Sequence, residues 1–244
     1  FLSSDDEHEV ATAAGELCHV GALDAAKALE LIGATNFCGS EHVADEVLSL
    51  FESPGPIPLD LLDSRSVNVL LDKLFPIPVL EKYWIQKFLA STSVRYPVET
   101  LDFFKKRVAH AASTEDYAFR PCNFGPYVHE PLRFAESAAF EDLCKDVWSW
   151  MRGGEGGDHK FQYFASHLLG AVFSATDDRT LSFMRNKCSG DSLDISLIGE
   201  ILCEADHAFS LDNPTFVVGY LTAAKSHGSK CLESATSALY SAAV

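Results

Sequence analysis

The sequence predicts an all-α protein, an irregular α-solenoid of antiparallel helix pairs of the HEAT type. Apolar residues recur at helical spacing along most of the chain, whereas the alternating pattern of a half-buried strand is essentially absent. Similar helix openings also return at intervals between 34 residues (from Ser66 to Thr100) and 41 residues (from Ala139 to Thr180), lengths that suit one pair of helices. These openings are Ser66-Val67, Thr100-Leu101, Ala139-Phe140, Thr180-Leu181 and Thr215-Phe216. Because the repeat is degenerate, a compact helical bundle is the alternative.

The N-terminal part predicts four helices. Each has apolar residues on one face and a residue that can begin or end a helix: serine as an N-cap, glycine as a stop, or proline as a break. The expected helices run from Glu7 to His19, from Ala22 to Ile32, from Ser40 to Phe51 and from Ser64 or Ser66 to Leu74. Gly21 and Gly33 are expected to end the first two.

Residues 78–112 give the clearest local pattern, two helices joined by a short turn. In the first, Leu80, Trp84 and Phe88 lie four residues apart on one face. Pro97 suits the first position of the second helix, because its fixed φ and missing N–H cost nothing there. Basic residues 105–107 come late in that helix, as the helix dipole favours. Neither helix can bury its apolar stripe alone, so the pair should pack against neighbouring helices.

The C-terminal part predicts six further helices. They are expected at about 138–151, 158–173, 178–188, 191–206, 214–226 and 229–243. The run Gly153-Gly-Glu-Gly-Gly157 predicts a flexible joint between the first two. The chain is nevertheless expected to form a single helical-repeat domain over residues 1–244.

Charge and composition argue against several classes of partner. The net charge is −16, from 19 basic and 35 acidic residues, which disfavours nucleic acid and anionic membranes. No apolar run reaches the roughly 18 residues of a membrane span. The seven cysteines include no C-x-x-C pair, which favours free thiols in a reducing compartment. We therefore expect a cytoplasmic protein, and since the chain begins with Phe1, a piece of a longer one.

Known catalytic motifs are absent from the sequence. There is no Walker phosphate loop, no G-x-S-x-G elbow and no H-E-x-x-H zinc motif. The one metal alternative is a pair of Glu-x-x-His motifs, Glu16 with His19 and Glu204 with His207, which on helices could contribute to a ferritin-like di-iron centre. Chance pairs are expected among nine histidines and many glutamates, so we predict no metal, no cofactor and no enzyme activity for this chain.

An aromatic-rich segment over residues 117–134 is the candidate interaction site. Aromatic rings with arginine in a loop are the usual composition of a protein-binding hot spot. The candidate residues are Tyr117, Phe119, Arg120, Phe124, Tyr127 and, outside the segment, Trp150. The alternative is that these rings fill the groove between stacked helix pairs.

Two segments of the sequence resemble a known family. The first comprises Phe119-Arg120-Pro121, Leu132-Arg-Phe-Ala-Glu-Ser137 and Val147-Trp148-Ser-Trp150. The second comprises Phe216-Val-Val-Gly-Tyr-Leu-Thr-Ala-Ala224 and Ser237-Ala-Leu-Tyr-Ser241. Both resemble the helical-repeat region of large bacterial STAND-type NTPases. In that family a C-terminal helical array recognises a trigger, often a phage protein. The resemblance thus implies a sensing or scaffolding part without NTPase motifs.

These observations favour a non-catalytic module for protein–protein interaction. Its partner would be another protein or other domains of the parent chain. A structural spacer or an oligomerisation segment is the remaining alternative.

Overall fold

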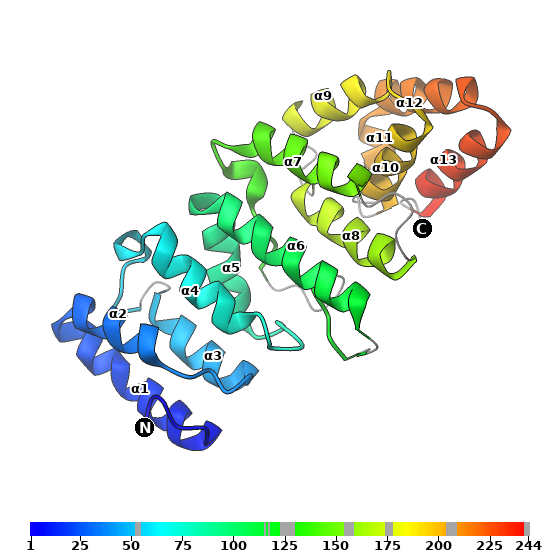
Figure 1. Ribbon diagram of the computed structural model, residues 1–244. Helices are drawn as coiled ribbons and strands as arrows, with labels where there is room; N and C mark the ends of the chain where they lie inside the picture. The colour runs from blue at the N-terminus through cyan, green and yellow to red at the C-terminus, as the bar shows by residue number, and fades with distance from the viewer. Residues whose placement is uncertain are drawn as a thin grey trace. The chain divides into compact units, whose positions relative to one another are not determined.

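The computed structural model describes residues 1–51, 55–114, 116, 118–122, 130–153, 159–173, 178–203 and 209–241. These residues form α-helices and short 3₁₀ helices joined by loops, with no strand among them (Figure 1). The all-α prediction is therefore confirmed. Where the sequence predicts one domain, the contacts divide the chain into two compact units, unit 1 (Phe1–Arg133) and unit 2 (Phe134–Val244). None of the described helices has both the length and the apolar character needed to cross a membrane.

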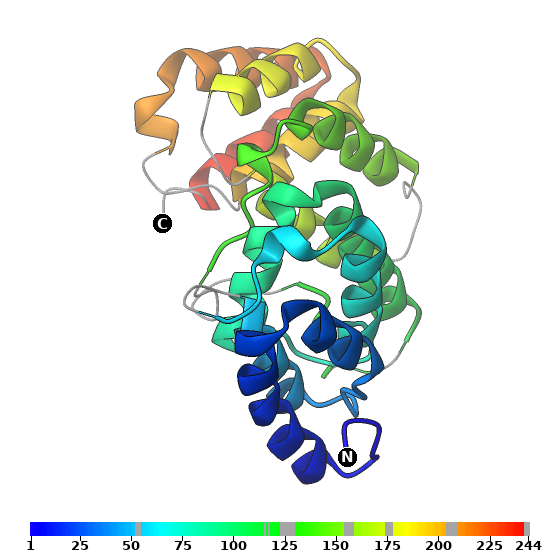
Figure 2. The ribbon, with the colours of Figure 1, turned by 90° about the vertical axis from the view of Figure 1, so that its left-hand side faces the viewer.

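Unit 1 is built from two rows of helices. One row contains α1, α3 and α5, in which α3 contacts both of the others; the second contains α2, α4 and α6, in which α4 contacts both of the others. The pairs α1–α2 and α5–α6 connect the rows, and Figure 2 shows α1 in dark blue beside both of its neighbours. The helices are α1 (Glu7–Leu23), α2 (Ala25–Ala34), α3 (Glu41–Leu48), α4 (Ser64–Leu74), α5 (Tyr83–Arg95) and α6 (Pro97–Ser113).

Unit 2 repeats this arrangement. Helix α10 contacts α8 and α13 in one row, and α9 contacts α12 in the other; the pairs α7–α8, α9–α10 and α12–α13 also pack together. Contact between a helix and the next but one along the chain is what stacked helix pairs produce. The helices are α7 (Phe140–Gly153), α8 (His159–Val172), α9 (Asp178–Lys187), α10 (Ser192–Cys203), α11 (Phe209–Asp212), α12 (Pro214–Ser226) and α13 (Ser229–Ser241).

Helices that pack between two others bury residues on more than one side. Helix α10 buries Ile195, Leu197, Ile198, Ile201 and Leu202, residues that cover more than one side of a helix, because it packs between α8 and α13. Helix α5 lies similarly between α3 and α6 and buries even its polar Gln86.

The sequence predicts that Gly21 and Gly33 end the first two helices, but both helices continue past them. Helix α1 continues through Gly21 to Leu23, and α2 continues through Gly33 to Ala34. Gly21 is needed for packing, since a Cβ there would lie 3.1 Å from carbon atoms of both Pro56 and Ile57. Asp24 separates the two helices, and its carboxylate accepts a hydrogen bond from the N–H of Lys27.

The start of α5 is fixed by carboxylates from α3. Glu41 accepts hydrogen bonds from the N–H groups of residues 81 and 82, and Asp45 accepts them from Trp84 and Ile85 at 2.8 and 3.3 Å. These acceptors satisfy N–H groups that the first turn of a helix leaves without partners. The helix therefore begins at Tyr83, and Leu80 is buried in the preceding segment instead of in the helix.

The start of α10 is fixed by a polar network inside unit 2. Arg152, near the end of α7, donates to Asp191 at 2.7 Å and to Asp194 at 2.5 Å. Asp194 is buried and also accepts the indole N–H of Trp148 at 2.8 Å. This network ties α7 to α10 directly before the predicted joint. Gly153 is the last residue of α7, and the rest of the joint (154–157) lies outside the described residues.

Candidate interaction surfaces

Phe119, one of the predicted contact residues, is part of the core of unit 1. Its side chain is 4% exposed, and its ring lies 4.9 Å from the ring of His110 and 4.3 Å from the guanidinium of Arg107. The interpretation of Phe119 as a surface contact was therefore wrong. The alternative, a ring that fills the space between packed helices, describes it correctly.

Arg107 holds this segment in place. The residue is 0% exposed, and its guanidinium donates to six backbone carbonyl oxygens. Four belong to the last residue of α4 and the chain after it (Leu74, Phe75, Ile77 and Pro78), and two belong to Arg120 and Pro121. Burial lowers the pKa of Arg107 to about 9, so the group stays protonated at neutral pH. The segment around residue 120 is thus a structural strap across α6.

The other predicted residues fall into three groups. Arg120 is exposed and forms an ion pair with Glu81 at 2.7 Å. Trp150 is half-buried, with its ring centre 5.1 Å from that of Phe161. Tyr117, Phe124 and Tyr127 lie outside the described residues. Of the three candidates that the structure describes, Arg120 and Trp150 are placed where a partner could touch them.

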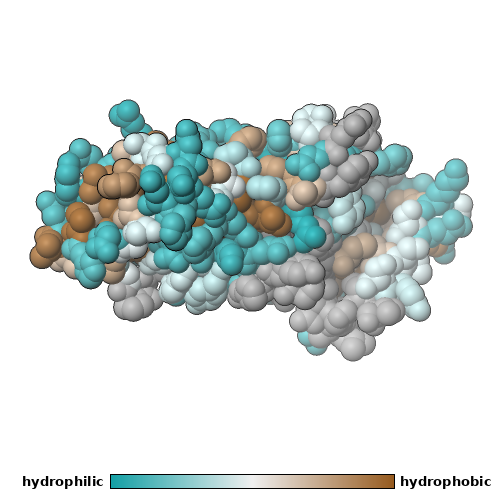
Figure 3. Space-filling model, turned by 90° about the horizontal axis from the view of Figure 1, so that it is seen from below, coloured by the Kyte–Doolittle hydropathy of each residue, from teal (hydrophilic) through white to brown (hydrophobic). Residues whose placement is uncertain are grey.

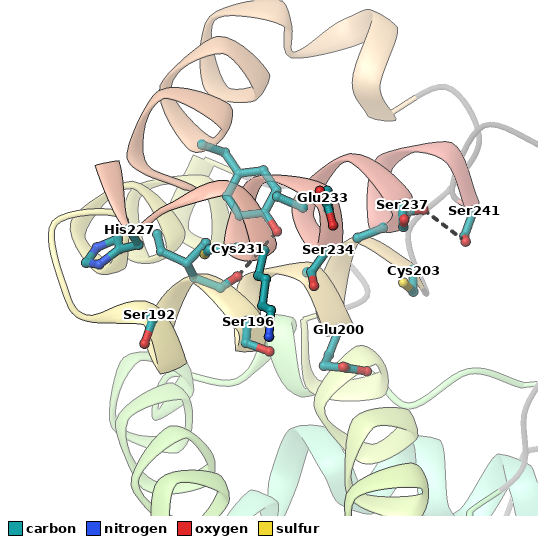
Figure 4. Close-up of a pocket in the computed structure, with 16 residues that line it drawn as sticks. Ser192, Ser196, Glu200, Cys203, His227, Cys231, Glu233, Ser234, Ser237 and Ser241 are labelled. Atoms are coloured by element: carbon teal, nitrogen blue, oxygen red, sulfur yellow. Dashed lines mark hydrogen bonds between the residues drawn. The ribbon is translucent and has the colours of Figure 1, made fainter. Parts of the chain in front are cut away.

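A groove in unit 2, the α10–α13 groove, is a more extensive surface. It has a volume of about 850 Å³ and runs along the contact between α10 and α13. Figure 4 shows Ser196 and Glu200 of α10 facing Ser234 of α13, with His227 toward one end and Cys203 toward the other. The lining is dominated by small hydroxyl side chains and a few charged groups.

Small residues at the helix contact create the floor of this groove. Gly199 is buried, and a Cβ there would lie 3.0 Å from the hydroxyl oxygen of Tyr220 and 3.5 Å from the Cβ of Ala238. The two helices can approach closely only because Gly199, Ala235 and Ala238 are small. Tyr220, buried beneath them, donates its hydroxyl to the carbonyl oxygen of Ile195.

Five polar side chains of the groove are available to a partner. Within the part of the chain that the structure describes, no hydrogen bond or ion pair engages the side chains of Glu200, Lys230 and Glu233. Ser196 and Ser234 are exposed, and their hydroxyl groups have no protein partner there either. Hydroxyl, carboxylate and ammonium groups together can donate and accept hydrogen bonds along a bound chain.

Two cysteines near this groove, Cys231 and Cys188, are not activated. Burial raises the pKa of Cys231 and of Cys188 above the ordinary thiol value. Because the thiolate is the nucleophile, a raised pKa lowers the reactivity of a cysteine at neutral pH. The ring of His227 contacts the carbonyl oxygen of Gly190 at 3.1 Å and is not hydrogen-bonded to any described serine. All seven cysteines of the chain are free, and two of them, Cys122 and Cys144, are buried.

The first Glu-x-x-His motif lies on the surface of α1. Glu16 and His19 are both exposed, whereas di-iron ligands project into the interior of a helical bundle. Glu204 and His207 lie outside the described residues. Among the residues that are described, no group of three or more histidine, cysteine, aspartate or glutamate side chains could hold a metal ion.

A second groove, the α1–α2 groove, lies in unit 1. Its volume is about 720 Å³, and it lies between the two helices beside the first residues of the chain. Leu2, Ala13 and Leu31 give it an apolar floor, while Glu9 and Glu16 are exposed on α1. Figure 3 shows hydrophobic patches in brown over the first helices, bordered by hydrophilic residues in teal.

Neither groove could be located from sequence patterns alone. The α10–α13 groove exists because three small residues on two helices face one another, and nothing in their spacing says which helix each will meet. The one available signal was the density of acidic residues before position 50, which marks the surroundings of the α1–α2 groove. No protein-family model, curated protein or solved structure matches the chain.

Proposed function

We propose that this chain is a non-catalytic helical module that binds a protein partner through the α10–α13 groove. The observation that carries the proposal is a set of polar side chains along that groove that no other described residue engages, namely Ser196, Glu200, Lys230, Glu233 and Ser234. Water covers these groups in the free protein, and a bound chain can replace it without leaving a polar group unsatisfied. The partner we infer is a polar protein segment held by hydrogen bonds.

The chemistry of the groove favours binding over catalysis. An active-site nucleophile needs a neighbouring base or a lowered pKa. Here the pKa of Cys231 is raised by burial, and the ring of His227 contacts the carbonyl oxygen of Gly190 and no described serine. The long, shallow contact between two helices instead presents many weak hydrogen-bonding groups, as interfaces do.

The resemblance to STAND-type proteins suggests the context of this binding. We propose that the module is a sensing or scaffolding part of a larger signalling protein, and that its partner is a trigger protein or another domain of its parent. Free thiols at all seven cysteines are compatible with a reducing compartment such as the cytoplasm.

The test is selection of peptides from a display library against the full chain, followed by binding measurements with one groove variant and one control. Ser234→Trp places an indole in the groove, whereas Thr236→Trp adds the same group at an exposed position of α13 outside it. We expect selected peptides to bind the wild type and Thr236→Trp equally and to bind Ser234→Trp at least tenfold more weakly.

Two outcomes would contradict the proposal. One is a library that yields no peptide with reproducible binding. The other is a set of peptides whose affinity is the same for Ser234→Trp and the wild type, with circular dichroism showing that both are folded. Peptides that bind elsewhere would leave the chain a binding module but remove the α10–α13 groove as its site.

A further inference from the structure

We propose that the α1–α2 groove is a docking site for a basic amphipathic helix of a partner protein. This proposal shares with the proposed function only the idea that the chain binds protein segments. The two grooves lie in different units, so either proposal can fail while the other holds.

The shape of the groove suits a helix. Helix α1 packs into unit 1 through the face that carries Val10, Ala14 and Leu17. Residues 9, 12, 13 and 16 have the spacing of a second face of the same helix, and this second face lines the groove. The side chains in the middle of this second face are small, and the residues at its two ends, Glu9 and Glu16, carry carboxylates. Leu31 and Ala34, three residues apart on α2, line the groove from that helix. An amphipathic helix binds such a groove through apolar residues at i, i+3, i+4 and i+7.

The groove is held open by contacts of the chain before α1. The N–H of Asn36 donates to the carbonyl oxygen of Leu2 at 2.7 Å, and its side-chain amide donates to the carbonyl oxygen of Ser4 at 3.2 Å. The hydroxyl of Ser4 in turn donates to the carboxylate of Glu9 at 2.9 Å. These bonds fix the segment along the groove to both α1 and the loop after α2, and a preformed groove lowers the entropic cost of binding.

Charge identifies the kind of helix. Residues 1–51 contain ten aspartates and glutamates and one basic residue, Lys27, a net charge of −9 out of −16 for the whole chain. Lys27 forms an ion pair with Glu30 at 2.6 Å. The carboxylates of Glu9 and Glu16 stand at the two ends of the small-residue face, where lysine or arginine side chains flanking an apolar stripe would reach them. A concentration of one sign of charge accelerates association with the opposite sign and disfavours a like-charged partner.

The same charge argues against the other possible occupants. A second copy of this chain would bring nine net negative charges toward nine more. An acidic or neutral helix would fit the apolar floor but would gain nothing from the ends of the groove. Of these occupants, only the basic helix would both contact the apolar floor and pair with the carboxylates at the ends of the groove.

The experiment measures binding of a synthetic helical peptide to the full chain by fluorescence anisotropy. The probe peptide has leucine at i, i+3, i+4 and i+7 and lysine elsewhere, and the comparison peptide has glutamate in place of every lysine. We expect the lysine peptide to bind at least tenfold more tightly than the glutamate peptide, with an affinity that falls as salt is added.

Variants separate the groove from the general charge of the protein. Ala13→Trp fills the floor and should weaken the lysine peptide at least tenfold. The pair Glu9→Gln with Glu16→Gln keeps the shape and should weaken it severalfold. The control pair Asp72→Asn with Asp212→Asn removes the same charge from exposed positions on α4 and α11 and should change little.

Three results would overturn this proposal. The first is a lysine peptide that binds no better than the glutamate peptide. The second is an equal loss of affinity in both charge-removing pairs, which means attraction by net charge alone. The third is a wild type that sediments as an oligomer while Ala13→Trp sediments as a monomer, because the groove would then bind a second copy of the chain. Ser234→Trp should leave the lysine peptide unaffected, and this separates the outcome from that of the proposed function.

Discussion

Arg107 shows how one buried cation can organise a loop without any carboxylate. Its neighbours Lys105 and Lys106 belong to the same basic run, yet only Arg107 is 0% exposed. Because it lies on the face of α6 that meets the strap around residue 120, its planar fork reaches carbonyl groups on two separate segments. An ordinary pair of apolar side chains could fill the same volume but would leave those carbonyl oxygens unsatisfied.

Replacing Arg107 with methionine should destabilise unit 1 strongly. The substitution keeps much of the volume and removes every donor, so buried carbonyl groups lose their partners. We expect a loss of about 3–5 kcal/mol in the free energy of unfolding, measured by urea denaturation. Arg120→Met is the matched control, because that side chain is exposed and its ion pair contributes only about 0–1 kcal/mol. Equal losses in the two variants would show that Arg107 is not the organising residue.

Asp191 should make unit 2 sensitive to acid. The hydrogen bonds from Arg152 hold the pKa of Asp191 well below its ordinary value of 3.8. As the pH falls, the unfolded chain takes up this proton first, so the ionised aspartate stabilises the fold above about pH 4 and that stabilisation is lost below it. The wild type should therefore lose its stability advantage over Asp191→Asn as the pH is lowered from 5 to 2. The measurement is the free energy of unfolding of both proteins, determined by chemical denaturation at each pH. A constant difference across that range would contradict the assignment; Asp72→Asn, exposed on α4, is the control.

At the scale of elements, the sequence predicts the helices well and their contacts poorly. The position of α6 follows from Pro97, and that of α12 from Pro214, both at a first helical position with similar backbone angles in the residue before. Periodicity also identifies the buried face of α7, including Trp148. It fails for Gln86 and Arg107, because a polar side chain can be buried wherever another segment supplies its hydrogen bonds, and that segment is distant in sequence.

The same reason explains what the sequence could tell about the candidate sites. Aromatic composition singled out Phe119, whose ring is buried by the strap that Arg107 holds. The grooves depend on pairs of helices, α1 with α2 and α10 with α13, and on small residues such as Gly199 that have no signature of their own. Local patterns therefore give the elements, and the surfaces between elements require coordinates.

The capping of α5 by α3 gives a prediction at this scale. Asp45 accepts the N–H groups of Trp84 and Ile85 from the neighbouring helix, which is the task an N-cap residue usually performs from the same helix. Asp45→Ala should lower the free energy of unfolding by about 1–2 kcal/mol, as loss of a helix cap does. Asp45→Asn keeps a side-chain oxygen in place and should recover most of the loss. If alanine and asparagine behave alike in urea denaturation, the contact does not cap α5.

At the scale of the whole molecule, each of the two units has its own set of packed helices. Unit 1 has α3 between α1 and α5, and unit 2 has α10 between α8 and α13, so each unit contains a central helix with neighbours on both sides. A chain of 133 residues or of 111 residues is long enough to bury a core of its own. Local contacts between successive helices also favour independent folding, because few long loops must close first.

We therefore expect residues 1–133 and residues 134–244 to fold when expressed separately. The cut preserves the hydrogen bond from the N–H of Arg133 to Ser93 in unit 1 and the 3₁₀ turn Phe134–Glu136 in unit 2. The helical circular dichroism of the two fragments should add up to that of the whole chain, and each should unfold cooperatively in urea. A fragment that binds a hydrophobic dye and shows no cooperative transition would mean that its helices need the other unit to pack. In the folded case, the lysine peptide should bind the first fragment alone, and the peptides selected for the α10–α13 groove should bind the second, because each groove is lined by residues of one unit.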